Sequence, residues 1–336
     1  MNIIVTGGCG FIGSNLIKKL IKIKTNKVLN IDSLNYASMP ESLFDIKKNK
    51  NYFFIKNNLS HINQIKKIIK SFKPSIIFHL AAESHVDNSI NAPRVFLNSN
   101  IISTFNILES IRQLNYNKKN FRFIHVSTDE VYGSLKNKKD RPFDEESKFY
   151  PNSPYSTTKA SSDLLVRAWN KTFNIPSITT NCVNNYGIWQ FPEKLIPVVI
   201  FSCLNKKEIP VYGNGKNIRE WINVSDHNEC LIRIARKGNL GENYNIGSGF
   251  ELENIDLIKK ICNYFDKNFP YKKNYDTLIK FVEDRPAHDF RYALNTKKLN
   301  KIINKKSFKN FDDGINETIK WYIDNYKWLA KKIKNK

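Results

Sequence analysis

The chain has 336 residues with an ordinary apolar share of 41%, which is enough for one large or two modest domains with a buried core. Its net charge of +23 comes mainly from lysines spread along the whole chain, and this argues against a nucleic-acid-binding arm. No apolar run could span a bilayer, and the first residues do not resemble a signal peptide, so we expect a cytoplasmic protein without membrane contact. Five scattered cysteines and six histidines lack metal-ligand spacing, so we expect no metal site.

Strand-like and helix-like patterns alternate along the first 185 residues. Short apolar runs predict strands at 3–5, 28–32, 75–80, 121–127 and 177–183. Apolar residues at helical spacing predict helices over 16–21, 62–72, 101–111 and 155–173. Repeated strand–helix units favour parallel strands with helices on both faces. The predicted fold class is therefore α/β, a Rossmann-type doubly wound parallel sheet.

The regular alternation of strand-like and helix-like patterns ends after residue 186. From there on, shorter elements are separated by prolines at 192, 197, 210, 270 and 286. We expect a Rossmann domain over 1–185, with a returning segment around 215–250. A smaller, mixed and discontinuous substrate-binding domain is expected over 186–336.

Glycines follow the first predicted strand in the spacing that dinucleotide-binding folds use. Gly7, Gly10 and Gly13 would allow a tight turn, close approach of a pyrophosphate to the backbone, and close packing of the next helix. The amino end of that helix would face the phosphates with free N–H groups. Asp32 ends the second predicted strand, where a carboxylate accepts from ribose hydroxyls and repels a 2′-phosphate. The sequence therefore predicts NAD rather than NADP.

Tyr155 and Lys159 are four residues apart on a predicted helix, so both side chains lie on one face. A free tyrosine has a pKa of about 10, and a nearby ammonium would lower that pKa. Tyr155 would then take a proton from a sugar hydroxyl while a hydride leaves, and Lys159 would also hold the nicotinamide ribose.

Thr128, Asp129 and Glu130 follow the predicted strand 121–127, at the sheet end where open α/β folds bind ligands. Thr128 would hydrogen-bond the same hydroxyl as Tyr155. Two adjacent carboxyl groups in different surroundings can act as an acid and a base. A solvated acidic turn is the alternative interpretation of Asp129 and Glu130.

Several segments together resemble the extended short-chain dehydrogenases/reductases, and within them the dTDP-glucose 4,6-dehydratase family. The resemblance rests on Thr-Asp-Glu-Val-Tyr-Gly at 128–133 and on Tyr-x-x-x-Lys at 155–159. Further matching segments, in order along the chain, are 35–37, 79–87, 153–163, 184–187, 192–197 and 285–289.

This resemblance implies a lyase that converts dTDP-glucose to a 4-keto-6-deoxy sugar with NAD as a resident cofactor. Tyr155 would remove the C4 hydroxyl proton as NAD accepts the C4 hydride. Glu130 would take the C5 proton, Asp129 would protonate the departing C6 hydroxyl, and the hydride would return to C6. The resemblance also implies a homodimer formed by helices near 98–115 and 155–173.

The resemblance further implies contacts by motif position. Besides the glycines, Asp32, Tyr155 and Lys159, NAD would contact Phe11, Ile12, Ser33, Leu34, Asn35, Asn58, Leu59, Leu80, Ala81, Ala82, Ser84, Ser99 and Asn185. The nucleotide sugar would contact Ser84, Thr128, Asn184, Lys194, Leu195, Pro210, Val211, Tyr212, Arg219, Asn254, Asp284, Arg285 and His288. Arginines suit the diphosphate because a guanidinium binds two phosphate oxygens at once.

Some of these residues have simpler interpretations. Arg219 and Glu220 could form a surface ion pair, Asn254 could cap a helix, and Lys194 could be one more solvated lysine. His79 could be a buried structural histidine.

Four residues depart from the family pattern, and one of them, Pro40, replaces an apolar residue in a loop on the cofactor side. Asn58 replaces an acidic residue near the adenine, which predicts weaker NAD binding. Glu220 stands where Asp is usual. Ala287 stands where Gly is usual, which matters if the backbone there has a positive φ.

Other functions fit parts of the pattern. A nucleotide-sugar 4-epimerase, or another sugar-nucleotide dehydratase of the same fold, would share Tyr155 and Lys159. An epimerase, however, needs no adjacent acid and base. A non-catalytic basic binding protein would need none of these side chains. The sequence favours dehydration but does not separate dTDP from UDP as the nucleotide.

Overall fold

A seven-stranded sheet runs through the centre of the computed structural model, which describes residues 1–116 and 120–334. Residues 335 and 336, at the end of the expected smaller domain, lie outside the described residues. Every neighbouring pair of strands in this sheet is parallel. Across the sheet the strands follow the order β10 (Asn243–Ile246), β6 (Ser177–Cys182), β5 (Arg122–Thr128), β4 (Ile76–His79), β1 (Asn2–Thr6), β2 (Lys27–Asp32) and β3 (Tyr52–Lys56).

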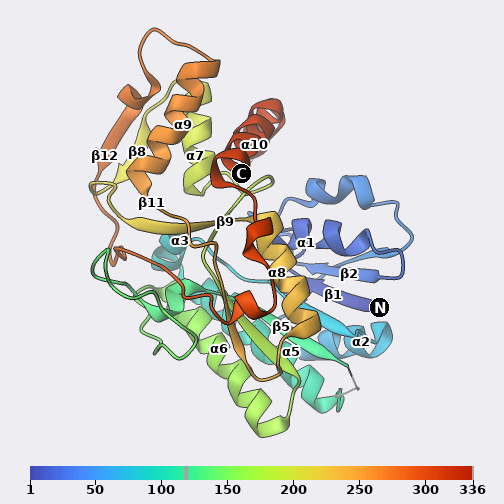
Figure 1. The fold of residues 1–336 in the computed structure, drawn as a ribbon. Coiled ribbons are helices and arrows are strands. Elements are labelled where there is room, and N and C mark those ends of the chain that lie inside the picture. The colour runs from blue at the N-terminus through green and yellow to red at the C-terminus, as the bar shows by residue number, and fades with distance from the viewer. Residues whose placement is uncertain (117–119, 335–336) are drawn as a thin grey trace.

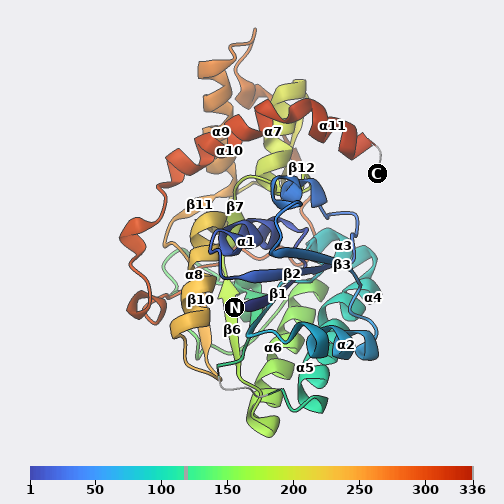
Figure 2. The same ribbon diagram turned by 90° about the vertical axis from the view of Figure 1, so that its right-hand side faces the viewer.

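Helices cover both faces of this sheet, because successive side chains of a strand point to opposite sides. Ile3 and Val5 of β1 pack in one apolar cluster, whereas Ile4 between them packs in another. The first cluster is completed by α1 (Phe11–Ile21) and α8 (Val224–Lys237), and the second by α2 (Ile62–Phe72), α5 (Ser103–Gln113) and α6 (Pro154–Phe173). Figure 2 shows the two groups of helices on either side of the sheet. The predicted Rossmann-type α/β fold is confirmed.

A smaller set of elements lies beyond the carboxyl ends of the large sheet, at the top of Figure 1. Two further sheets are formed by β7 (Asn184–Tyr186), β9 (Ile218–Asn223) and β11 (Glu251–Glu253), and by β8 (Ile209–Tyr212) and β12 (Ile279–Val282). The helices of this region are α7 (Leu195–Asn205), α9 (Asn254–Asn268), α10 (Phe311–Asp324) and α11 (Tyr326–Lys334). They share an apolar cluster of their own that includes Val199, Leu257 and Ile319.

A π-helical turn, η2 (Leu97–Ile102), interrupts the helical run that leads into α5. It follows the short helices α3 (Val86–Asn91) and α4 (Pro93–Phe96). The turn places the Asn100 side chain in the interior. There Asn100 accepts from the Glu83 N–H at 2.8 Å and donates to the Thr158 hydroxyl at 2.9 Å. π-helical turns often occur at functional sites. The remaining short turns are η1 (Pro40–Ile46), η3 (Asp129–Tyr132), η4 (Tyr275–Leu278), η5 (Leu299–Lys301) and η6 (Lys305–Ser307).

None of the helices over 1–116 and 120–334 is both long and apolar enough to cross a membrane. Within the same residues, no three His, Cys, Asp or Glu side chains group in a way that could hold a metal ion.

The strand order fixes where a ligand can bind. After β1 the chain adds strands on one side of the sheet, as β2 and β3, and then crosses to the other side, beginning with β4. Ligands of open α/β sheets bind at such a switch point, outside the carboxyl ends of the strands. Here those ends are Thr6, His79 and Thr128.

Candidate active site

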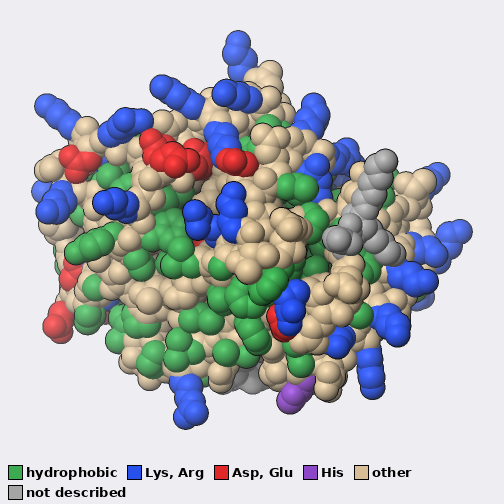
Figure 3. Space-filling view, turned by 90° about the horizontal axis from the view of Figure 1, so that it is seen from below, with side chains coloured by type: hydrophobic (Ala, Val, Ile, Leu, Met, Phe, Trp, Pro, Cys, Tyr) green, Lys and Arg blue, Asp and Glu red, His purple; other side chains and the backbone are tan. Residues whose placement is uncertain are grey.

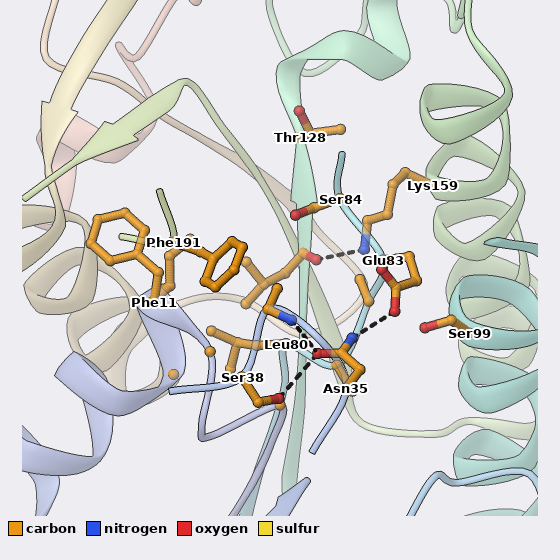
Figure 4. Close-up of a pocket in the computed structure, with 18 of the residues that line it drawn as sticks. Phe11, Asn35, Ser38, Leu80, Glu83, Ser84, Ser99, Thr128, Lys159 and Phe191 are labelled. Carbon is orange, nitrogen blue, oxygen red and sulfur yellow. Dashed lines mark hydrogen bonds between the residues drawn. The ribbon is translucent and has the colours of Figure 1, made fainter. Parts of the chain in front are cut away.

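A cavity of about 310 Å³ opens at this switch point. Its lining includes all five expected catalytic residues and every expected cofactor contact except Leu34. Ser84, Asn184 and Lys194 of the expected sugar-nucleotide contacts also line it. Figure 4 shows Phe11 and Phe191 on one side of the cavity, and Glu83, Ser99 and Lys159 on the other.

The glycines form a cradle that any side chain would fill. A Cβ atom on Gly7 would lie 2.7 Å from the Ala81 nitrogen, and one on Gly13 would lie 2.3 Å from the Gly7 carbonyl oxygen. Gly7 also has a positive φ of 69°. No side chain caps the amino end of α1, so its first N–H groups point to the cavity without a capping oxygen. These features fit a dinucleotide pyrophosphate.

Asp32 organises the loop that borders this cradle. One carboxylate oxygen accepts from the Cys9 N–H at 2.8 Å. The other accepts from the Leu34 N–H at 2.8 Å and from the Ser38 hydroxyl at 2.9 Å. Leu34 itself has a positive φ of 58°, so its backbone turns toward Asp32 while its side chain packs against the core.

Replacing Asp32 with alanine is expected to empty the protein of bound NAD and to lower its free energy of unfolding by about 2–4 kcal/mol, because each unsatisfied buried donor costs about 1–3 kcal/mol. NAD content after purification and urea unfolding would measure the two effects. Asp32→Asn keeps one acceptor oxygen and should lose less stability. A wild-type NAD content in Asp32→Ala would contradict the assignment.

His79 supports the same edge from inside the sheet. Its Nδ1 lies 2.7 Å from the Thr6 hydroxyl, and its Nε2 lies 3.0 Å from the Thr104 hydroxyl. Burial holds the pKa of His79 well below its usual range, so the ring is neutral. The Thr6 oxygen in turn accepts from the Ala81 N–H at 3.2 Å. His79 is therefore a buried structural residue that supports the cofactor loop.

Asp129 is the buried member of the expected acid–base pair, with an exposed fraction of 2%. The Thr128 hydroxyl donates to its Oδ1 at 3.2 Å. Its Oδ2 has no hydrogen-bond partner among the described residues. Burial, followed by the charges of Glu130 and Glu220, raises the pKa of Asp129 well above its usual range. The raised pKa favours the protonated form of Asp129, and its burial makes the alternative of a solvated turn wrong for this residue.

Glu130 is only partly buried and lines the cavity beside Asp129. Burial raises the pKa of Glu130, whereas the positive charges of Arg285, Arg219 and Lys194 oppose that rise. The two adjacent carboxyl groups thus have different surroundings, which is what separate acid and base roles require.

Tyr155 and Lys159 both line the cavity, but they do not interact as expected from the sequence. The Lys159 ammonium donates to the Val126 carbonyl at 2.8 Å. Burial and then the charge of Glu130 raise the pKa of Tyr155 well above its usual range. The sequence predicted that the Lys159 ammonium would lower this pKa, whereas in the structure burial raises it and the ammonium is directed at a strand carbonyl.

A second group of expected contacts lies outside the cavity lining, on the smaller set of elements. The Tyr212 hydroxyl donates to Asp87 at 3.1 Å, and the Arg285 guanidinium lies 3.7 Å from the same carboxylate. His288 lies 2.6 Å from Asp284 and packs edge-on to Tyr212. Pro210 and Val211 precede Tyr212 on β8, and Leu195 is the first residue of α7.

The simpler interpretations of three residues are wrong. Arg219 is buried, and its guanidinium donates to the carbonyl oxygens of Ile218 and Asp289 instead of pairing with Glu220. Lys194 donates to the Ser84 carbonyl at 2.8 Å. Asn254 begins α9, but its Oδ1 is buried and has no partner among the described residues, so it makes no cap.

The departures from the family pattern have local consequences. Asn58 lines the cavity, with its Oδ1 accepting from the Ser60 N–H and hydroxyl. Glu220 accepts from two backbone N–H groups, those of Gly249 and Leu294. Ala287 has a φ of 53°, a conformation that costs a non-glycine residue about 1–2 kcal/mol.

Comparisons with known proteins agree with this geometry. A family model described as GDP-mannose 4,6 dehydratase matches residues 4–318. A protein of Escherichia coli (strain K12) named dTDP-glucose 4,6-dehydratase 1 is 44% identical over 341 residues, covering 98% of this chain and 94% of the relative. The chain belongs to the dTDP-glucose 4,6-dehydratase family. The resemblance inferred from the sequence motifs is confirmed.

Solved structures of dTDP-glucose 4,6-dehydratases have the same fold. One from Bacillus anthracis str. Ames, in complex with NAD, is 37% identical, with a TM-score of 0.87 and 99% of each chain covered. Another from Streptomyces venezuelae, a double mutant with NAD bound, is 33% identical, with a TM-score of 0.91, covering 99% of this chain and all of the other.

Sequence reasoning missed part of the cavity of this dTDP-glucose 4,6-dehydratase family member. Tyr36 lines it, accepting from the Asn88 amide at 2.8 Å and donating to Glu193 at 3.2 Å. The Tyr36 ring also packs edge-on to Phe191. Tyr36 lies inside one matching segment and Glu193 inside another, so the family motifs were the signal that could have found them.

Proposed function

We propose that the protein is an NAD-dependent 4,6-dehydratase that converts dTDP-glucose to dTDP-4-keto-6-deoxyglucose and water. The observation that carries this proposal is the pair Asp129 and Glu130, which lines the same cavity as Tyr155 and Lys159. The names of the full-length relatives support it, as do the NAD-bound structures of the family.

The residues around the switch point fit NAD. Gly7, Gly10 and Gly13 would hold the pyrophosphate, Asp32 would hold the adenosine ribose, and Lys159 would hold the nicotinamide ribose. When bound, NAD supplies the hydride acceptor, returns the hydride, and adds a positive charge in its oxidised form.

Different side chains of the protein then carry out the separate proton transfers. Tyr155 takes the proton of the C4 hydroxyl, which Thr128 positions by a hydrogen bond. The 4-ketone acidifies the neighbouring C5–H, and Glu130 takes that proton as the base. Asp129 donates its proton to the departing C6 hydroxyl, which leaves as water. The raised pKa of Asp129 fits this donor role, because a carboxyl group must be protonated to act as the acid.

The expected nucleotide contacts remain part of this proposal. Arg219 and Arg285 supply positive charge for the diphosphate, and their fields already act on Glu130. Asn254 offers a buried amide oxygen without a partner among the described residues. His288, Tyr212 and the β8 residues before it would border the nucleotide.

Purified protein is expected to form the 4-keto-6-deoxy product from dTDP-glucose without added NADH. UDP-glucose should react more slowly in the same assay. The alternative, a 4-epimerase, uses Tyr155 and Lys159 alone and would give dTDP-galactose. Formation of dTDP-galactose without water loss would therefore replace the dehydratase assignment.

We also propose a homodimer that forms through α5 and α6. These helices pack side by side, and apolar residues on and near them are exposed, including Leu164 at 55% and Phe173 at 43%. Figure 3 shows hydrophobic side chains gathered on the underside of the molecule, where α6 lies in Figure 1. Light scattering should give twice the mass of one chain, and Leu164→Glu should shift it to the monomer mass. A monomer mass for the wild-type protein would refute the dimer.

Domain division and location complete the proposal. A Rossmann domain over 1–185 would include the returning strand β10, and the smaller nucleotide-sugar domain would follow from 186. A cytoplasmic location fits the five cysteines, which are scattered along the chain and are all buried.

A further inference from the structure

Asp163 is a buried carboxyl group that the proposed mechanism does not use. It lies one helical turn after Lys159 on α6, so the two side chains share a face of the helix. The exposed fractions of Lys159 and Asp163 are 4% and 3%. An acid and a base this deeply buried would each be costly alone.

Two strands hold the Asp163 carboxylate in place. The His125 Nε2 on β5 lies 3.1 Å from its Oδ1, and the Asn181 Nδ2 on β6 donates to its Oδ2 at 3.0 Å. Burial keeps the pKa of His125 well below its usual range. The neutral ring therefore donates from Nε2, since its partner is an acceptor, and adds no charge of its own. The opposite charges left in this cluster are those of Asp163 and Lys159.

The same network reaches the catalytic strand end. The Asn181 amide that binds Asp163 also donates to the Thr128 carbonyl at 3.3 Å. Lys159 is fixed from the other side by its bond to the Val126 carbonyl. Asp163 thus connects the helix that carries Tyr155 and Lys159 to the strand that carries Thr128.

We propose that Asp163, held by His125 and Asn181, is a positioning residue that keeps the buried Lys159 ammonium charged and in place at the cavity wall. This inference rests on the proposed role of Lys159 in holding the cofactor.

The electrostatics of the cluster give the sign of the effect. Burial lowers the pKa of Lys159, and the charge of Asp163 opposes that fall. Burial raises the pKa of Asp163 to about 7, against the effects of Lys159, Ser127 and Asn181. The other titratable groups that face this pair are His79 and His125 on β4 and β5, Cys182 on β6 and Tyr132 on η3. Removing the Asp163 charge therefore makes Lys159 lose its proton at a lower pH.

The test compares Asp163→Asn with wild type across pH. The amide preserves the shape and one acceptor for His125 but carries no charge. The alkaline limb of the kcat profile should move to lower pH by about one unit, because an opposite charge nearby shifts a pKa by about 1–3 units. The pH at which bound NAD is released should move the same way, which gives a readout independent of turnover.

Two further variants keep the test decisive. His125→Leu removes the donor but keeps the carboxylate, so both pH limits should move in the same direction by less, even if Asp163→Asn fails to fold. Asp226→Asn is the matched control, since Asp226 is a half-buried carboxylate with a raised pKa on α8, and it should move neither limit.

Unmoved limits in a folded Asp163→Asn protein would overturn the inference. So would an equal loss of activity at every pH that follows a lowered melting temperature, since that is the mark of a merely structural residue. A wild-type protein that binds NAD but does not dehydrate dTDP-glucose would contradict the proposed function instead, and the NAD-release profile would still decide the role of Asp163.

Discussion

Tyr155→Phe is expected to lower kcat for dTDP-glucose by about 10²–10⁴-fold, the contribution of a positioned general base. The change removes only the phenolic oxygen, so the ring keeps its edge-on contact with Phe96. The glycine cradle and Asp32 are untouched, and NAD should therefore remain bound. Product formation and NAD content, measured on the same preparation, separate the loss of chemistry from the loss of cofactor.

The matched control for this variant is Tyr150→Phe, because Tyr150 is 77% exposed and lies outside the cavity lining. It should turn over dTDP-glucose at the wild-type rate. Near-wild-type activity in Tyr155→Phe would exclude Tyr155 as the base in the first step that dehydration and epimerisation share.

Glu130→Gln is expected to abolish the exchange of solvent deuterium into C5, with a loss of turnover of about 10²–10⁴-fold. Glutamine keeps the shape and the position at the cavity wall but has no basic oxygen of comparable strength. Mass spectrometry of the sugar recovered from deuterated water measures the exchange directly.

Asp129→Asn provides the comparison, because it should slow water loss while C5 exchange continues through Glu130. The Glu130 variant is thus expected to fail to break the C5–H bond, and the Asp129 variant is expected to be slow in breaking the bond between C6 and its hydroxyl. Normal C5 exchange in Glu130→Gln would exclude Glu130 as the base. Unimpaired water loss in Asp129→Asn would exclude Asp129 as the acid.

Five of the seven strands of the central sheet could be predicted closely because they are short apolar runs buried on both faces. β3, which is mostly exposed, and β10 were not predicted as strands. The strand expected at 121–127 is β5 at Arg122–Thr128, and the helix expected at 155–173 is α6 at Pro154–Phe173. The glycine cradle could also be predicted from the sequence, because its chemistry depends on residues that are close together in the chain.

The smaller elements could not be predicted in this way. β7 and β11 have three residues each, and both pair with β9. The β11 pairing is antiparallel, whereas β7 pairs in parallel with a strand that is distant from it in sequence. Such short strands are set by their partners more than by their own residue pattern.

Side-chain partners were the least predictable feature of the site. Arg219 and Glu220 are neighbours on β9, but successive residues of a strand point to opposite faces, so they cannot pair with each other. In the same way the sequence places Lys159 beside Tyr155, while the fold directs its ammonium to the Val126 carbonyl. Helical spacing along the chain indicates that two side chains share a face of the helix. The direction in which each side chain then points depends on how the helix packs in the fold.

The π-helical turn at Leu97–Ile102 limits how the length of this region can vary. Each residue of an α-helix advances the chain by about 100° around its axis. Deleting one residue to restore ordinary α-helical pairing would rotate α4 against α5 by that amount. Asn100 would then leave Glu83 and Thr158, and Ser99 would leave the cavity wall. A deletion scan should therefore find this segment far less tolerant than the surface loop at 136–148, although neither supplies a catalytic side chain.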